Sequence, residues 1–543
     1  MIYRYMTNYP LPIILLIGIV LLTCAQPKIS KEPMTFETGE IPRSLSPLNY
    51  VESSPVLLAA GKTLYDKKCA PCHGLDGAGE GKAAYLLYPK PRDFVAARYR
   101  MVSTWERVPT DDDIFGTVSR GIPGSSMPSW AHLSENKRWS LVHYIKSFAD
   151  EPLLPNTVVG DSGEGMLNIP PEIEYTLKDA KLASERFRDA CASCHGATGE
   201  GDGVTEQIDE KGIPTRPRDL TMGVFKGNPA PKEIYRRIVL GMPGTPMPMS
   251  DWSYGEDAWH LTHFILEMSS EEQREIAEMK KFRIVANRVE KIPEHPDAGI
   301  WREAGTINIH MMPLWWRVER PEILTVEALH DGRELALRLT WTDATDDHTA
   351  IRVQDFRDAA AVEFSAESDP PFFGMGEKNQ SVTIWMWKSE RQADLEPTFQ
   401  DIDKMYPNLG IDSYPNLMKS ALEQPARNAL TLESDPDFIT GWGAGNIVSD
   451  PTRKSAVENL SAKGFGTLKA RPRIEQYVKS FGIYDIGTYR VVFKRSMKGE
   501  GQNSLDFVPG QHLSVAFSVW NGSAGDRDGK KSVTIWQELI IAP

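Results

Sequence analysis

The chain contains nearly the same six residues twice, as CAPCHG at 69–74 and CASCHG at 191–196. Their surroundings match as well, because Tyr65 and Phe187 each lie four residues before the first cysteine, on a stretch that reads as an amphipathic helix. Three later phrases recur in the same order: PRDF (91–94) and PRDL (217–220), GIPGSSMPSW (121–130) and GMPGTPMPMSDW (241–252), RWSLVHYIKSF (138–148) and AWHLTHFILEM (258–268). This self-similarity indicates an internal duplication of a unit of about 90 residues.

Four of the five cysteines fall into these two repeats. A Cys-x-x-Cys pair can be a redox dithiol or half of a zinc site, but a thioredoxin-like dithiol needs a βαβ context and a zinc site would leave both histidines without a role. Cys-x-x-Cys-His is instead the attachment pattern of c-type haem, in which the thiols bind the vinyl groups and the histidine lies beneath the iron. The repeats therefore predict two covalent haems, held by Cys69, Cys72, Cys191 and Cys194, with His73 and His195 as iron ligands.

Each repeat runs from the cysteine helix through an irregular loop and a Met-Pro loop to an aromatic closing helix. This order resembles class I cytochrome c over most of residues 56–268. The resemblance implies an all-α fold for each unit and a methionine as the second iron ligand, which is Met127 in the first unit and Met247 in the second. Met242 and Met249 are alternatives in the second loop, although alignment with Met127 favours Met247.

Two histidines and two arginines need a separate interpretation. His143 and His263 each follow a tryptophan by four residues on the closing helix, a spacing that favours helix packing over iron ligation. Arg92 and Arg218, in the PRDF and PRDL phrases, are candidates for contact with haem propionates, and a solvated loop position is the alternative.

The N-terminus carries an apolar run from about Leu11 to Leu22, preceded by Arg4. This length fits a signal peptide better than a membrane span, which needs roughly 20 apolar residues. The run ends in LLTC, which resembles a bacterial lipobox with Cys24 as the lipidated residue, although Thr23 departs from the usual small residue. A plain signal peptide or an uncleaved anchor is the alternative. We therefore expect a periplasmic or otherwise extracytoplasmic chain that a lipid attaches to a membrane.

Size and charge limit the possible partners. A chain of 543 residues predicts about three or four domains. The net charge is −13 and no long basic run is present. This balance argues against nucleic acid and anionic lipid as partners.

From about Ile300 the pattern changes to strands. LTVEALHDGRELALRLTW (324–341) predicts a hairpin with Asp331-Gly332 at the turn and Leu335, Leu337, Leu339 and Trp341 on one face. SVTIWMW, TYRVVFKR, HLSVAFSVW and KSVTIWQEL predict further strands, and helical signals are sparse outside about 395–425. The pattern favours a mostly antiparallel β domain of the sandwich type.

Several phrases of this region go further. FRDAAAVEF, PPFFGMGEKNQSVTIWMWK, WGAGN, VENLSAKGFGTL, GTYRVVFKR and VWNGSAGDRDGKKSVTIW resemble, in this order, the haem-binding domain of γ subunits of the ethylbenzene dehydrogenase type. The resemblance covers about 310–543, with an extra segment near 390–440. It implies one non-covalent haem b held between a methionine and a lysine. By position these are Met375 and Lys531, with Met386 and Lys530 as the rivals.

Strand geometry favours Lys531 over Lys530. Side chains alternate between the two faces of a strand, so the two lysines point in opposite directions at the start of KKSVTIW. Lys531 shares its face with Val533 and Ile535, which we expect to point inward, whereas Lys530 shares a face with Ser532 and Thr534, which we expect to be solvated.

The ligands imply that all three irons are six-coordinate, which leaves no position for a substrate. We therefore expect an electron-transfer subunit rather than an enzyme. The family resemblance implies an iron–sulfur subunit and a molybdopterin subunit as partners, with a soluble or membrane cytochrome as the other redox partner. Nitrite oxidoreductase is the enzyme class that the combination of c and b haems most resembles. A γ subunit of a nitrate, selenate or chlorate reductase, a stand-alone lipoprotein carrier and a dihaem enzyme are the alternatives.

The expected fold class is multidomain, with two all-α class I cytochrome c domains followed by a mostly antiparallel β-sandwich that binds haem. Ser269 to Phe282 reads as a capped connecting helix. The expected division is a signal peptide at 1–24, a linker at 25–55, cytochrome domains at 56–152 and 179–268 with a linker at 153–178, a connecting helix and linker at 269–299, and the β domain at 300–543.

Overall fold

The computed structural model describes residues 37–150, 153, 165–372, 374–395, 408, 453–501 and 504–543. Cys24 and the apolar run before it lie outside the described residues, as do most of 390–440 and the phrase WGAGN. Among the helices of the described part, none has the length and apolar character that crossing a membrane requires.

The first cytochrome unit is built from short helices around the CAPCHG repeat. Ser54 caps the first helix by accepting a hydrogen bond from the Leu57 N–H at 3.2 Å, and Thr110 and Asp113 form a capping box at the third. The elements are α1 (Pro55–Lys68), α2 (Ala70–His73), η1 (Ala84–Leu86), α3 (Asp111–Arg120) and α4 (Glu135–Lys146).

Helices α1 and α4 cross at Gly61. A Cβ atom at this position would lie 2.1 Å from the Ser140 carbonyl oxygen, so the two backbones approach too closely for any side chain. Tyr65, fully buried one turn later, donates a hydrogen bond to the Gly74 carbonyl oxygen at 2.8 Å. The crossing therefore fixes the helix that ends at the CAPCHG repeat.

The second unit repeats this arrangement, with Thr176 and Asp179 as the capping box of its first helix. One departure from an all-helical unit is a small antiparallel strand pair, β2 (Gln207–Ile208) and β3 (Pro214–Thr215), in the loop after CASCHG. The other elements are α5 (Leu177–Ala190), α6 (Ala192–His195), η2 (Leu220–Met222), α7 (Pro231–Leu240), η3 (Asp251–Ser253) and α8 (Glu256–Glu267).

The helix expected between the second unit and the β domain is present but shorter than the phrase suggested. It is α9 (Glu271–Ile276), and Ser270 and Gln273 form its capping box. Strand β4 (Phe282–Arg288) follows at once and enters the sheet.

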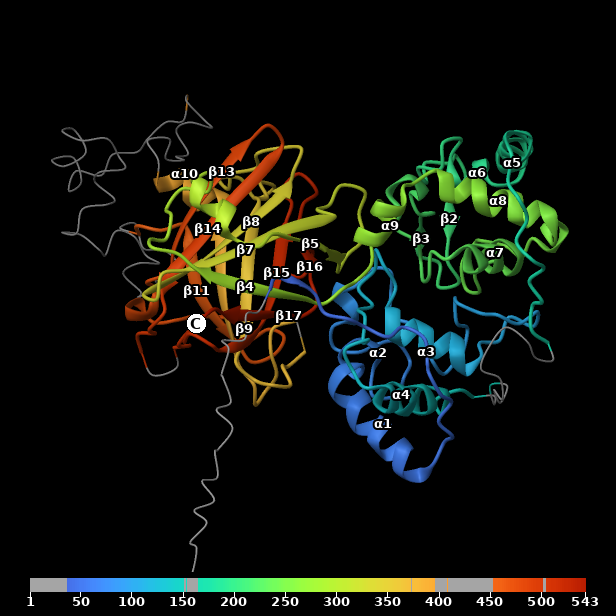
Figure 1. Ribbon diagram of the computed structural model, residues 1–543, viewed down its shortest axis with the longest axis horizontal. Coiled ribbons are helices and arrows are strands. Elements are labelled where there is room, and N and C mark those ends of the chain that lie inside the picture. The colour runs from blue at the N-terminus through green and yellow to red at the C-terminus, as the bar shows by residue number, and fades with distance from the viewer. Residues whose placement is uncertain are drawn as a thin grey trace, which may run out of the picture. The chain divides into compact units, whose positions relative to one another are not determined.

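The C-terminal region is a 15-stranded sheet, with β1 (Gly39–Glu40) added from the N-terminal side (Figure 1). The main path runs β12-β11-β10-β9-β15-β17-β4-β7-β8-β14-β13, and β4 pairs in parallel with β17 and β7 while the other described strand pairings are antiparallel. Besides β1 and β4, the elements are η4 (Gly299–Glu303), β5 (Ile307–His310), β6 (Met312–Pro313), β7 (Ile323–His330), β8 (Glu334–Thr342), β9 (Ala359–Ser365), β10 (Val382–Lys388), α10 (Ser389–Leu395), β11 (Val457–Ala462), β12 (Lys469–Ala470), η7 (Arg473–Glu475), β13 (Lys479–Asp485), β14 (Thr488–Ser496), β15 (His512–Trp520), β16 (Ser532–Val533) and β17 (Gln537–Ile541).

The expected hairpin is confirmed. β7 and β8 pair across a turn in which Gly332 has a φ of +85° and the Asp331 carboxylate accepts hydrogen bonds from two backbone N–H groups. The four residues expected on one face of the second strand, Leu335, Leu337, Leu339 and Trp341, are all buried.

The two halves of the sheet path share one hydrophobic core. Trp341 on β8 lies 6.3 Å from Trp387 on β10, and Trp387 in turn lies 5.7 Å from Tyr489 on β14, measured between ring centroids. β8 and β14 belong to one half and β10 to the other, so the sheet folds over to bury these rings between its halves.

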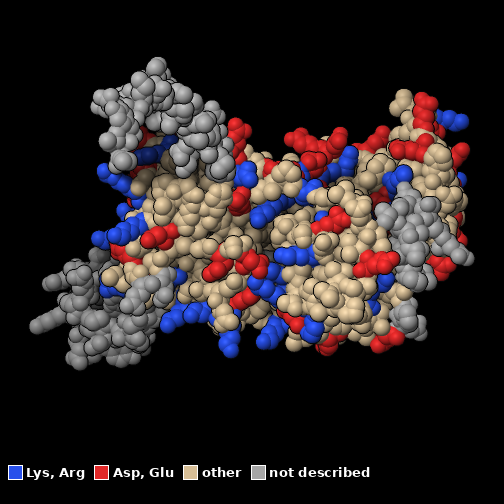
Figure 2. Space-filling view, turned by 60° about the horizontal axis from the view of Figure 1, so that its bottom comes forward, with Lys and Arg blue, Asp and Glu red and all other residues tan. Residues whose placement is uncertain are grey.

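Acidic and basic side chains are interspersed over the face of the molecule drawn in Figure 2. This face therefore carries no broad surface of acidic side chains alone among the residues drawn in colour.

Candidate haem sites

The first candidate site is a cavity at the CAPCHG repeat. Cys69, Cys72, His73 and Met127 line it together, and both cysteines are free thiols. Most of the remaining wall is apolar and comes from Leu87, Phe94, Ile114, Val118, Trp130 and Ile145. Two thiols, an imidazole and a thioether facing one apolar cavity are the donor set that a covalently bound haem requires.

The imidazole of His73 is held in a defined orientation. Its Nδ1 lies 2.9 Å from the Arg92 carbonyl oxygen, which leaves Nε2 available as a ligand atom. Burial lowers the pKa of His73 to about 4, so the ring is neutral and offers a lone pair at neutral pH.

The two methionine loops have the same hydrogen bonds. The carbonyl oxygens of Met127 and Met247 accept from the Ile122 and Met242 N–H groups at 3.0 and 3.2 Å. Their own N–H groups each donate at 3.3 Å to the hydroxyl two residues earlier. Met242 therefore occupies the position of Ile122, and the Met249 side chain is 40 % exposed, so the geometry favours Met247 as the partner of Met127.

The CASCHG repeat differs from the CAPCHG repeat in how its histidine is held. His195 ends α6 as His73 ends α2, but its Nδ1 has no hydrogen-bond partner among the described residues. Burial lowers the pKa of His195 to about 4, so this ring is also neutral at neutral pH. Cys194 Sγ accepts a hydrogen bond from Gln207 Nε2 at 3.2 Å, from strand β2.

His143 and His263 lie as expected for helix packing. His143 Nε2 is 2.7 Å from the Val51 carbonyl oxygen, and the ring stacks on Trp139. His263 stacks on Trp259 and lies 3.5 Å from a Glu172 carboxylate oxygen.

Each of the two arginines considered for propionate contact, Arg92 and Arg218, contacts the other cytochrome unit. Arg92 of the first unit forms an ion pair with Glu210 of the second. Arg218 of the second unit lines the first cavity and donates from Nη2 to the Pro123 carbonyl oxygen at 3.2 Å. The homologous arginines thus connect the two units reciprocally.

Met375 lies against the outer face of the β9–β10–β11–β15 part of the sheet. It packs with Met386 and Trp520 in a small cluster separate from the main core, and its φ of +92° is unusual for a residue with a side chain. Lys531 Nζ lies 4.6 Å from the centre of the Trp520 ring. Met375, Met386 and Lys531 therefore lie on the side of the sheet that carries Trp520.

Glu363 is a residue of this site that sequence reasoning missed. It accepts a hydrogen bond from the Met375 backbone N–H and interacts with the Lys531 ammonium, and burial raises its pKa to about 8. Burial also lowers the pKa of Lys531. A single acidic residue within the apolar strand AAAVEF was the signal that could have identified it.

One premise of the strand argument for Lys531 is wrong. Ser532 and Thr534, expected to be solvated, are completely buried. Strand β16 pairs with β15 at one edge and β6 at the other, and the buried Thr534 hydroxyl accepts a hydrogen bond from the Phe517 N–H at 3.0 Å instead of meeting water. The preference for Lys531 over Lys530 has other support, because Lys530 Nζ already donates a hydrogen bond to the Ala524 carbonyl oxygen.

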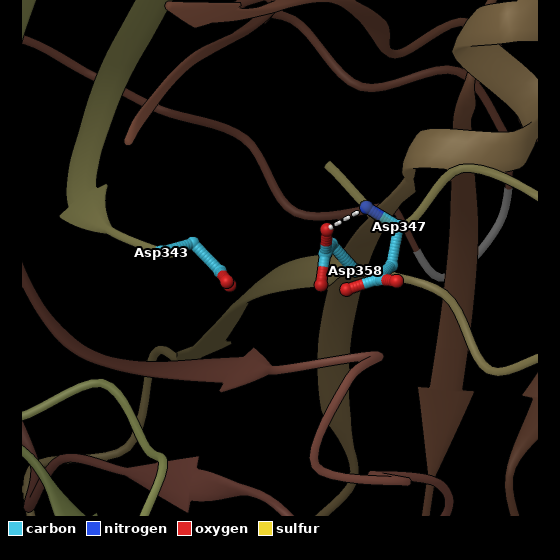
Figure 3. A group of neighbouring side chains, drawn as sticks. All are labelled: Asp343, Asp347 and Asp358. Carbon is cyan, nitrogen blue, oxygen red and sulfur yellow. Dashed lines mark hydrogen bonds between the residues drawn. The ribbon is translucent and has the colours of Figure 1, made fainter. Parts of the chain in front are cut away.

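A group of three carboxylates, two of them buried and one half-buried, lies between the end of β8 and the start of β9 (Figure 3). Oxygen atoms of Asp343, Asp347 and Asp358 lie within 4.8 Å of one another, and the Asp347 N–H donates to Asp358 at 2.7 Å. Burial raises the pKa of Asp358 to about 8 and that of Asp343 to about 6. Tyr489 Oη and Asn521 Nδ2 donate to these carboxylates, so the group ties three segments of the β domain together.

Family models match three segments of the chain. Residues 56–145 match cytochrome c oxidase, cbb3-type, subunit III, residues 180–269 match cytochrome c, and residues 300–532 match ethylbenzene dehydrogenase. The chain joins two cytochrome c domains to a domain of the ethylbenzene dehydrogenase family. The expected multidomain organisation, with a C-terminal domain made mostly of sheet, is confirmed.

Relatives of the ethylbenzene dehydrogenase-family domain include named subunits of three oxidoreductases. A Haloferax mediterranei protein named as a respiratory nitrate reductase heme subunit is 22 % identical over 46 % of this chain and 69 % of its own length. The dimethylsulfide dehydrogenase γ subunit of Rhodovulum sulfidophilum is 25 % identical over 45 % of this chain and 74 % of its own. The chlorate reductase γ subunit of Ideonella dechloratans is 21 % identical over 45 % and 78 %.

One solved structure is also similar. A chain of the reducing HAO-like protein complex of Kuenenia stuttgartiensis is 33 % identical, with a TM-score of 0.35, and the match covers 41 % of this chain and 99 % of that one.

Replacement of Met247 by histidine tests the second ligand of the second cytochrome domain. We expect covalent haem to be retained and the reduction potential of this haem to fall, because imidazole donates more strongly to iron than a thioether does. Potentiometric titration of the c-type absorption band measures the shift, and Met249→His is the matched control. A near-infrared methionine–iron band at full strength in Met247→His, together with a weaker band in the control, would assign Met249 instead.

Proposed function

We propose that this chain is an extracytoplasmic multihaem electron-transfer subunit. It would carry electrons between the iron–sulfur subunit of a molybdopterin oxidoreductase and a cytochrome or the respiratory chain. The observation that carries the proposal is the presence of two cytochrome c domains and an ethylbenzene dehydrogenase-family domain in one chain. The relatives are named as haem or γ subunits of oxidoreductases, which supports the role of a subunit that transfers electrons and does not itself catalyse a reaction.

The geometry described above supports the proposed ligands. Two haems c would be bound through Cys69 and Cys72, and through Cys191 and Cys194, and one haem b would be held without covalent bonds. The proposed iron ligands are His73 with Met127, His195 with Met247, and Met375 with Lys531. When bound, the haems supply one-electron redox chemistry. Two protein ligands for each iron leave no position for a substrate, which favours electron transfer over catalysis.

The haem b ligand loop is anchored to the first cytochrome domain. Lys68, the residue before Cys69, donates to the Pro370 carbonyl oxygen at 2.7 Å and lies 3.1 Å from the Asp369 carboxylate. Phe372 of the same loop lines the first haem cavity. These contacts support a direct electron-transfer step between the proposed haem b and the first haem c.

The partner enzyme that we propose first is a nitrite oxidoreductase-like complex. Its support is the combination of c and b haems in one subunit, and the nitrate, dimethylsulfide and chlorate enzymes of the relatives mark the alternatives. Attachment to a membrane through a lipid on Cys24 belongs to the same proposal, and this residue lies outside the described part of the chain.

Haem stoichiometry is the first test of the proposal. Acid-acetone extraction followed by pyridine haemochrome spectra should give two haems c for each haem b, because only the latter lacks thioether bonds. The double variant Cys191→Ser/Cys194→Ser should give one of each and serves as the internal calibration. A c-to-b ratio of 2:0 in the intact protein would contradict haem b binding by the C-terminal domain.

Two further observations separate the alternatives. Purification of the native complex distinguishes an oxidoreductase subunit from a stand-alone carrier. Binding of carbon monoxide by the reduced protein would require an open iron position and would favour a dihaem enzyme.

A further inference from the structure

The charge on the wall of the first haem cavity has one sign only. Six basic side chains line the cavity, and among the described residues no aspartate or glutamate does. Three of the six come from the loop after the CAPCHG repeat and two come from the second cytochrome domain: the six are Lys68, Lys90, Arg92, Arg100, Arg218 and Lys226.

Two of these charges are balanced by a carboxylate, and two others, Lys90 and Arg218, donate to a backbone carbonyl oxygen. Lys68 pairs with Asp369, Arg92 pairs with Glu210, and Lys90 donates to the Ala84 carbonyl oxygen at 2.9 Å. Within the described residues, the other three form no ion pair within 4.0 Å: Arg100, Arg218 and Lys226.

Arg218 is the most enclosed of the three. Only 9 % of its side chain is exposed, and its Nε has no hydrogen-bond partner in the described part of the chain. A Cβ atom on Gly124 would lie 3.0 Å from the Arg218 guanidinium carbon, so the absence of a side chain there makes room for the guanidinium. The first domain's ligand loop is thus shaped to admit an arginine from the second domain.

Burying these charges without anions is unfavourable. Burial, followed by the Arg320 charge, lowers the pKa of Arg218 to about 9. Burial and the neighbouring arginines lower the pKa of Lys226. Carboxylates beyond ion-pair distance offset part of this cost, Glu322 for Arg218 and Asp209 and Glu210 for Arg100. Transfer of a cation from water costs free energy unless a counter-charge lies beside it, so an anion in this cavity would be strongly favoured.

We propose that the second cytochrome domain completes the haem site of the first, and that Arg218, with Arg100 and Lys226, binds the propionate groups of the first haem c. This inference rests on the proposed function, because the anions are those of the haem that the cavity would hold. A guanidinium presents two parallel N–H groups to a carboxylate, and the resulting charge-assisted hydrogen bonds fix geometry as well as charge. Arg218 would then be a positioning residue shared by both cytochrome domains.

The test is the reduction potential of each c haem in the full-length chain carrying Arg218→Gln. A Met247→His background separates the two c-type steps, because it lowers the potential of the second haem only. Loss of a positive charge beside the first haem favours the oxidised state of the iron, which is the more positive one, and so lowers the reduction potential. We expect the one-electron equilibrium to shift about tenfold, which corresponds to a fall of about 59 mV. The exposed Arg216, two residues earlier in the same loop, supplies the control Arg216→Gln, which should not shift it.

Two results would overturn the inference. One is a shift in the second haem's step with the first unchanged, and the other is the same response in Arg218→Gln and the control. Arg218→Lys retains the charge and should restore most of the potential; an equal shift in this variant would mean a purely structural role and would also overturn it. Haem ratios from the same samples distinguish the failures, since a wrong ratio contradicts the proposed function and a correct ratio with an unmoved potential contradicts this inference alone.

Discussion

Lys531→Ala is expected to abolish low-spin haem b while both c haems stay unchanged. Lys531 Nζ lies over Trp520 on the side of the sheet that carries Met375, and burial lowers its pKa, which helps to free the amine for iron. The c haems are bound covalently by other domains, so their spectra provide an internal standard. The haem b content and the low-spin signal at neutral pH measure the effect.

Lys530→Ala is the matched control. The Lys530 ammonium already donates to the Ala524 carbonyl oxygen and should have no part in haem ligation, so haem b should be retained. Loss of haem b in the control with retention in Lys531→Ala would reverse the assignment. Retention in both variants would exclude lysine ligation.

Gly61→Val is expected to destabilise the first cytochrome domain by about 3 kcal/mol or more, since the added side chain collides with backbone and overpacking of a helix contact is costly. The Cβ alone would lie 2.1 Å from the Ser140 carbonyl oxygen and 2.9 Å from the Tyr144 Cβ. Helix α1 would have to move, and Cys69 at its C-terminal end would move with it. Urea titration of the holoprotein, followed by the Soret absorption, measures the loss.

Gly116→Ala provides the comparison within the same domain. Gly116 lies inside α3, and no heavy atom lies within 4 Å of the position that a Cβ would take. Alanine should therefore raise stability by about 1 kcal/mol through its helix propensity. If Gly61→Val unfolded at the same urea concentration as this variant, the close crossing of α1 and α4 would not limit stability.

The parts of the fold that were predictable are those with a local signal. The duplicated CAPCHG and CASCHG repeats were sufficient to predict two helical units, and the Asp331-Gly332 turn with its alternating leucines specified the β7–β8 hairpin. The β2–β3 pair was missed because its two-residue strands are too short to show any periodicity.

The parts that were not predictable depend on contacts between distant segments. Ser532 and Thr534 were expected on a solvated face because alternation assumes that one face of a strand meets water, whereas the side chains on both faces are buried at 532–535. Glu363 and Arg218 gained their places in the candidate sites from tertiary packing. No local pattern could place Arg218 in the cavity of the other cytochrome domain.

The position of β17 has a consequence for how the protein is made. This last described strand, Gln537–Ile541, lies between β15 and β4 and so connects the two halves of the sheet. With the extracytoplasmic location proposed above, the two halves cannot close until residues 537–541 have crossed the membrane, whereas each cytochrome unit precedes β17 in the chain and can form its helical contacts earlier. The order of segments along the chain thus sets an order of assembly, in which the cytochrome units form first and the β domain closes when β17 is added between β15 and β4.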